Sequence, residues 1–82
     1  MAKASILVVE DDSDIQQLVS YNLIKAGFNV SCADSGEEGL QILEQEAIDL
    51  VLLDLMLPGK DGIEICSIIR SQQDTAQLPI IM

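Results

Sequence analysis

Apolar and polar residues follow two kinds of pattern along this chain. Continuous apolar runs, each only a few residues long, fall within residues 5–12, 48–54 and 78–82, and a more polar run covers 28–33. A continuous apolar run is typical of a strand buried on both faces, as in a parallel sheet. We therefore predict four strands in these ranges, the first closed by acids and the third the most hydrophobic.

Between the predicted strands, the apolar spacing becomes helical. The first such segment runs from Ser13, the predicted N-cap, to Gly27, the predicted C-terminal stop. Its apolar stripe comprises Ile15, Leu18, Val19, Leu23 and Ala26. A helix should therefore join the first two strands.

Two further helices are predicted after the second and third strands. Ser35 and Glu38 have the spacing of a capping box, followed by a stripe of Leu40, Leu43 and Ala47. A third helix should begin near Asp61 and carry Ile63, Cys66 and Ile69 on one face. Strands and helices that alternate in this way predict one α/β domain, over residues 1–82, with an open parallel sheet and crossover helices.

Composition limits what this segment can bind. Of the 82 residues, 14 are acidic and only four are Lys or Arg, so the net charge is −10. Nucleic-acid binding requires a basic surface, so we expect none through this segment. No apolar run reaches the roughly 20 residues of a membrane span, and no signal-peptide pattern is present, so we expect a cytoplasmic protein without membrane contact.

Carboxylates stand where two of the predicted strands end. Glu10 and Asp11 close the first strand, and Asp54 closes the third. If these strands are neighbours, the three acids converge at the carboxyl edge of the sheet, where open α/β sheets bind ligands. Converging carboxylates repel each other, and oxygen ligands favour a hard cation, Mg²⁺ before Ca²⁺. Asp54 could then attack phosphorus to form an acyl phosphate.

Two motifs carry a family resemblance. The stretches "ILVVEDD" and "LVLLDLMLPGKDG", with the spacing between them, resemble the CheY-like receiver domain of bacterial two-component response regulators. Their form is most similar to receivers that carry a winged-helix DNA-binding domain and regulate transcription. The resemblance implies a sheet of order 2-1-3-4-5, a sensor histidine kinase as partner, and Mg²⁺ as cofactor.

The resemblance also implies individual roles. Asp54 matches the phosphoacceptor, which takes its phosphoryl group from the kinase. Asp11 matches the acid that binds Mg²⁺ directly, and Glu10 matches its neighbour, which reaches the ion through water. Met56 matches the position whose backbone carbonyl completes the metal shell. Asp12 lies one place past the usual pair, and we interpret it as a solvated neighbour.

The sequence departs from the family pattern after Met82. Receivers have a Ser or Thr at the end of the fourth strand and a Lys at the end of the fifth, and neither position is included here. We therefore interpret residues 1–82 as a truncated receiver without the fifth strand and last two helices. Phosphorylation and switching should be impaired, and the bare edge of the fourth strand should favour self-association.

Two other functions compete with this hypothesis. A non-catalytic, self-associating receiver fragment would have the same carboxylates without their chemistry. An aspartate-nucleophile phosphohydrolase would be a true enzyme, but such enzymes resemble "DxD" after a first strand, and here Met56 stands two residues after Asp54. We therefore expect a signalling phosphoacceptor that is not an enzyme, beyond self-catalysed phosphorylation and dephosphorylation.

Overall fold

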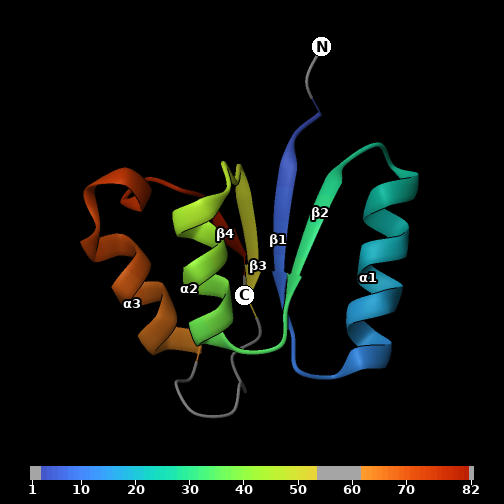
Figure 1. Ribbon diagram of the computed structural model, residues 1–82, viewed down its shortest axis with the longest axis horizontal. Helices are drawn as coiled ribbons and strands as arrows, with labels where there is room; N and C mark the ends of the chain where they lie inside the picture. The colour runs from blue at the N-terminus through green and yellow to red at the C-terminus, as the bar shows by residue number, and fades with distance from the viewer. Residues whose placement is uncertain (1–2, 54–61, 82) are drawn as a thin grey trace.

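The computed structural model describes residues 3–53 and 62–81, which form a four-stranded parallel sheet with helices on both faces (Figure 1). The elements in chain order are β1 (Ser5–Val9), α1 (Ser13–Lys25), β2 (Asn29–Ala33), α2 (Gly36–Gln45), β3 (Leu50–Leu53), α3 (Gly62–Ser71), a 3₁₀ turn (Gln73–Thr75) and β4 (Ile80–Ile81). The strand order is β2-β1-β3-β4. The predicted α/β class and strand order are therefore confirmed.

The register of the sheet aligns the carboxyl ends of three strands. Val9 of β1 pairs with Ala33 of β2 on one side and with Leu53 of β3 on the other. All three strands run in the same direction, so their carboxyl ends share the lower edge in Figure 1. This edge is where an α/β sheet of this kind binds ligands.

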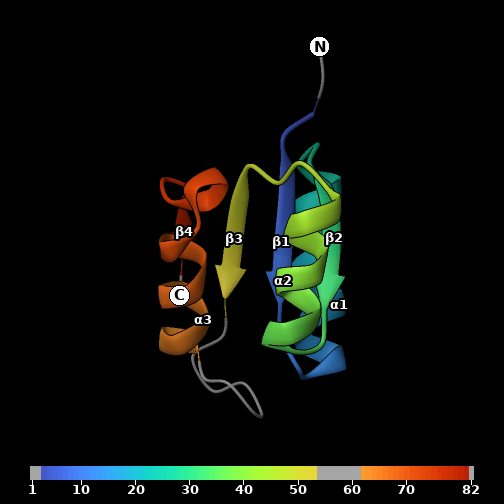
Figure 2. The same cartoon turned by 60° about the vertical axis from the view of Figure 1, so that its left-hand side comes forward.

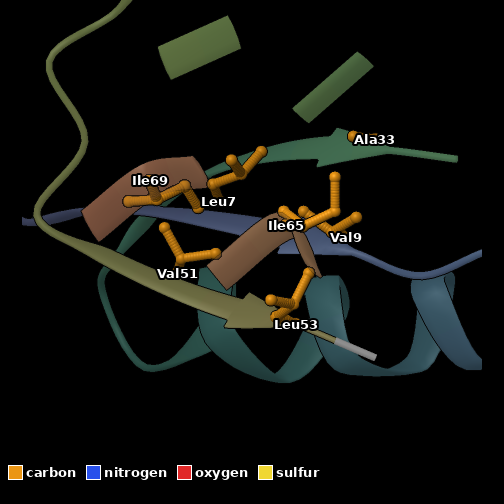
Figure 3. Packing of buried hydrophobic residues seen from close by; sticks show 7 residues of the cluster. All are labelled: Leu7, Val9, Ala33, Val51, Leu53, Ile65 and Ile69. Carbon is orange, nitrogen blue, oxygen red and sulfur yellow. The ribbon is translucent and has the colours of Figure 1, made fainter. Parts of the chain in front are cut away.

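The main core lies between the sheet and helices α2 and α3 (Figures 2 and 3). It consists of buried residues from three strands and one helix: Leu7, Val9, Ala33, Val51, Leu53, Ile65 and Ile69. Leu7, Ala33 and Val51 are completely inaccessible to solvent. Leu7 and Val9 of β1 both point into this core, because alternate side chains of a strand lie on the same face.

The opposite face of the sheet packs against α1 and is less completely covered. Ile6 and Val8 are buried there, but α1, all of whose residues are described, has no buried residue. Ile15 and Leu18 are 48% and 63% exposed. The stripe predicted for this helix was therefore only partly right: Val19 and Leu23 are half-buried, whereas Ile15, Leu18 and Ala26 are exposed.

The ends of α1 correct one prediction and confirm another. Asp12 is the N-cap in place of Ser13: its side chain accepts hydrogen bonds from the backbone N–H groups of Asp14 and Ile15. Asp12 has an extended backbone, which turns its carboxylate toward these orphan donors. Gly27 ends the helix with a φ of 100°, which only glycine adopts readily, so the predicted stop is confirmed.

The other two helices show one confirmed cap and one misassigned face. Ser35 caps α2 by accepting a hydrogen bond from the Glu38 N–H, as predicted. The face predicted for α3 was wrong at Ile63, which is 67% exposed. Ile65 and Ile69 supply the buried side chains, because the sheet lies on the side of the helix from which Ile63 points away.

Candidate functional site at the carboxyl edge of the sheet

Two of the predicted metal ligands lie together where β1 ends. Glu10 follows the last residue of β1 directly; it is half-buried and its N–H donates to the Ala33 carbonyl at 3.0 Å. Asp11 is the next residue and is exposed. Asp54 and Met56 lie outside the described residues, so the predicted convergence of all four positions remains a prediction.

Asp12 does not act as a merely solvated neighbour. Its Oδ1 accepts from the N–H groups of Asp14 at 2.9 Å and Ile15 at 3.2 Å, so this carboxylate is engaged in capping α1. The Asp12 N–H in turn donates to Glu10 Oε1 at 3.4 Å. The three consecutive acids of the acidic turn (residues 10–12) therefore have different surroundings, and Asp11 is the one that faces solvent without a capping role.

Gln16 is a polar residue at this edge that the sequence analysis did not single out. Its Nε2 donates to the carbonyls of Glu10 and Ala33 and to Asp34 Oδ1, at 3.0, 3.2 and 3.0 Å. One side chain thus joins the ends of β1 and β2 to the loop before α2. A signal was available, because Gln16 lies one helical turn before Val19 and Ser20, on the side of α1 that is half-buried against the sheet.

The donor chemistry of the acidic turn fits a hard divalent cation. Glu10 and Asp11 offer carboxylate oxygens, which Mg²⁺ prefers, and Mg²⁺ is commonly held by one or two carboxylates with water in the remaining positions. Among residues 3–53 and 62–81, no three Asp, Glu, His or Cys side chains gather closely enough to hold a metal. The described residues therefore supply two of the predicted ligands, and the other two, Asp54 and Met56, lie outside this part of the chain.

Cationic side chains in the described part of the chain lie away from this edge. Lys3 precedes β1, and Lys25 ends α1 just before β2, so both stand near the amino ends of strands. Arg70, in the last turn of α3, donates to the carbonyls of Ala76 and Leu78 before β4 begins. These three cations therefore do not offset the negative charge of the acidic turn at close range.

Comparison with known proteins decides the family. The model of the response regulator receiver domain matches residues 6–82, nearly the whole chain. The chain belongs to the response regulator receiver domain family. This family consists of signalling modules of two-component systems, so the resemblance inferred from the two motifs is confirmed.

Among curated proteins, the receiver chain is 46% identical over 78 residues to the transcriptional regulatory protein AfsQ1 of Streptomyces coelicolor. The match covers 95% of this chain but 33% of that protein, so the chain spans about a third of its relative's length. The link to a transcriptional regulator agrees with the subgroup suggested by the motifs.

Solved structures of receivers share this fold closely. The chemotaxis protein CheY4 of Vibrio cholerae is 33% identical with a TM-score of 0.93, and the match covers 96% of this chain and 66% of that one. The response regulator TrrA of Thermotoga maritima was solved in complex with Mg²⁺ and BeF, and it is 35% identical with a TM-score of 0.82. That match covers 87% of this chain and 62% of the TrrA chain. No helix in the described ranges is long and apolar enough to cross a membrane.

Proposed function

We propose that this receiver is a cytoplasmic phosphoacceptor module in which Asp54 takes a phosphoryl group from a sensor histidine kinase. Glu10, Asp11, Asp54 and the Met56 carbonyl are the proposed Mg²⁺ ligands. The observation that carries the proposal is the pairing of Val9 with Leu53. In the sequence, Glu10 follows Val9 and Asp54 follows Leu53. The acids of the two motifs therefore come directly after residues that pair between adjacent strands.

The proposed chemistry is a single phosphoryl transfer. A carboxylate oxygen of Asp54 attacks phosphorus, the bond from phosphorus to the donor breaks, and the donor nitrogen or oxygen leaves with the bonding electrons. Mg²⁺, when bound, neutralises charge on the phosphoryl oxygens. The role of Glu10 and Asp11 is to hold this cation beside the acceptor, so neither acid takes part in covalent bonding.

Mass spectrometry of the intact chain tests this proposal. Incubation with a small phosphodonor and Mg²⁺ should add one phosphoryl group, and Asp54→Asn should add none. Asp11→Asn should also abolish the modification, because it removes a cation ligand and leaves Asp54 intact. Modification of Asp54→Asn to the same extent as the unaltered chain would show that another residue is the acceptor.

We expect phosphorylation of the 82-residue chain to be slow and its switching impaired. The described cations, Lys3, Lys25 and Arg70, lie toward the amino ends of the strands. The charge of a phosphoryl group at the opposite edge would therefore lack a close cationic partner among these residues, and such partners stabilise phosphoryl-transfer transition states. Long-lived, stoichiometric phosphorylation with a clear conformational response would contradict this expectation.

The wider partners follow from the relatives and are proposed on that basis. AfsQ1 is a transcriptional regulatory protein, and we propose that this receiver likewise controls transcription. The net charge of −10 argues against DNA contact through residues 1–82 themselves. Its direct partner would therefore be a kinase, with any DNA contact made by another part of the regulator.

We also propose that the 82-residue chain associates with itself through β4. This strand stands at the edge of the sheet and Ile81 is 56% exposed. An apolar groove between the sheet and α1 reaches the same edge; its lining comprises Val8, Val9, Glu10, Ile15, Val19, Leu52, Leu53 and Ile81. A second edge strand is the partner whose backbone groups and apolar side chains match this surface, because edge strands pair with one another.

A further inference from the structure

We infer that Gln16 is a positioning residue for the acidic turn, and that its side-chain amide sets how tightly Glu10 and Asp11 bind a divalent cation. The inference rests on the proposed function, because it assumes that this turn holds the ion. It goes further by assigning a role in cation binding to a residue that has no carboxylate and belongs to neither acidic motif.

The amide of Gln16 meets three oxygen atoms. Nε2 lies 3.0 Å from the Glu10 carbonyl, 3.2 Å from the Ala33 carbonyl and 3.0 Å from Asp34 Oδ1. All three are acceptors, so the donor end of the amide must face them. An amide nitrogen carries two hydrogens, and three acceptors therefore share two donors. This arrangement holds the half-buried Gln16 side chain in one orientation.

These contacts restrain the backbone on both sides of the Glu10 Cα atom. The Glu10 N–H donates to the Ala33 carbonyl at 3.0 Å, and the Glu10 carbonyl accepts from Gln16. The first peptide group restrains φ of Glu10, and the second restrains ψ. Since the Glu10 carbonyl belongs to the peptide that joins Glu10 to Asp11, its direction also restrains the position of the Asp11 Cα atom, from which the carboxylate extends.

The backbone of Gln16 adds a second tie to the same turn. Its N–H donates to the Asp12 carbonyl at 2.9 Å, closing the first turn of α1. The acidic turn is therefore held at its first residue by the side chain of Gln16 and at its last by the backbone of Gln16. Without the amide, Glu10 and Asp11 would sample more orientations, and cation binding would have to order them.

Groups that orient metal ligands without touching the metal typically contribute about 10- to 100-fold to metal affinity. We therefore expect Gln16→Met, which keeps the length and helix preference of the side chain but removes its donors, to weaken Mn²⁺ binding about tenfold. Mn²⁺ is the probe because it accepts the same oxygen ligands as Mg²⁺ and its free form is counted directly by electron paramagnetic resonance. Gln17→Met is the matched control, since Gln17 is the exposed neighbour in the same helix.

A purely structural role for Gln16 must be separated from a positioning role. Asp49 Oδ2 accepts from the Ser5 N–H at 2.7 Å, at the other end of β1. Asp49→Ala removes this tie and should lower the melting temperature without changing Mn²⁺ affinity. Gln16→Asn, which withdraws the amide by one methylene, serves as a second variant if Gln16→Met does not fold.

Mn²⁺ titrations and thermal melts of these variants decide the outcome. The inference is supported if the Gln16 variant binds Mn²⁺ about tenfold more weakly while Gln17→Met and Asp49→Ala bind as the unaltered chain does. Equal Mn²⁺ affinity in the Gln16 and Gln17 variants overturns the inference and leaves the proposed function standing. If the unaltered chain binds no Mn²⁺, or if Asp11→Asn binds it equally well, the metal site itself is wrong, and the role of Gln16 is rejected with it.

Discussion

Three consecutive acids at the end of β1 show how far the surroundings of a residue can differ within one turn. Glu10 is half-buried, Asp11 is exposed, and Asp12 caps a helix. The capping carboxylate satisfies N–H groups that would otherwise lack a partner in the first turn of α1. The charge run is therefore divided between a structural role at its last residue and a proposed cation site at the first two.

Removal of the Asp12 carboxylate should therefore affect stability more than cation binding. We expect Asp12→Ala to lower the free energy of unfolding by about 1 kcal/mol, the usual effect of losing an N-cap. Asp12→Asn is the control, because it retains a capping oxygen without the charge. Urea unfolding measures the stability, and Mn²⁺ titration measures the binding. A loss of Mn²⁺ affinity in Asp12→Ala as large as that in Asp11→Asn would show that Asp12 is a ligand after all.

Gly36 is a second position where one residue determines local packing. A Cβ atom at Gly36 would overlap the side chain of Ile65, which is in the core. We expect Gly36→Ala to lower the free energy of unfolding by about 1–3 kcal/mol, as overpacking generally does. The overlap involves the Ile65 Cδ1 and Cγ1 atoms, both of which alanine lacks.

The double variant Gly36→Ala/Ile65→Ala tests this explanation, because it removes both overlapping atoms of Ile65. Ile65→Ala alone should cost about 2–5 kcal/mol through lost packing. If the overlap is the cause, the double variant should be more stable than the sum of the two single effects predicts. Additive losses, measured by urea unfolding of all four proteins, would mean that Gly36→Ala acts through another cause, such as the backbone at the start of α2.

At the scale of elements, the two faces of the sheet are unequal. Helices α2 and α3 pack against one face, around the cluster of seven buried residues that Figure 3 shows. Helix α1 covers part of the other face with no buried residue of its own. Its caps at Asp12 and Gly27 stabilise its ends, but caps contribute little compared with the burial of an apolar face. Among the three described helices, we therefore expect α1 to be the one that is packed least stably against the sheet.

Hydrogen exchange of the native chain should reveal this difference. We expect backbone amides of residues 17–25 in α1 to exchange faster than those of residues 40–45 in α2, since local opening is easiest where few apolar contacts are lost. Leu18→Ala, at a position 63% exposed, should change the free energy of unfolding by no more than about 0.5 kcal/mol. Protection in α1 as strong as that in α2 would contradict the expected order.

At the scale of the whole molecule, charge and exposed apolar surface act in opposite directions. The net charge of −10 opposes contact between copies, whereas the association proposed for the β4 edge and its groove would bring them together. Repulsion between exposed charges weakens with salt, because the screening length falls from about 8 Å at 0.15 M to about 3 Å at 1 M. The balance between monomer and oligomer should therefore depend on ionic strength.

Sedimentation velocity at micromolar concentration tests this balance. We expect self-association to increase from low to high salt, and Ile81→Lys to reduce it by placing a charge on the β4 edge. Ile63→Lys is the matched control, because Ile63 is 67% exposed on α3 rather than on β4, and the charge change is the same. A monomer at all salt concentrations, or an equal effect of the two variants, would exclude association through β4.

The sequence by itself determined the order of the elements and the family. Continuous apolar runs predicted β1 and β3, and glycine and serine at helix ends predicted the stop at Gly27 and the cap at Ser35, because these signals depend on neighbours in the chain. The motifs around Glu10 and Asp54 predicted the receiver family, because each motif is a continuous stretch of the sequence that can be compared directly with the family pattern. Asp54 and Met56 lie outside the described residues, so their roles remain proposals drawn from the sequence.

Only the tertiary structure decided which helical residues are buried and what holds the acidic turn. Helical spacing is compatible with several faces, and the position of the sheet selected Ile65 over Ile63 and left Leu18 exposed. Gln16 joins the ends of two strands through residues up to 18 positions away in the sequence. Such a contact depends on where β1, β2 and α1 lie in space, whereas helical spacing alone indicates only that Gln16 shares a side of α1 with Val19.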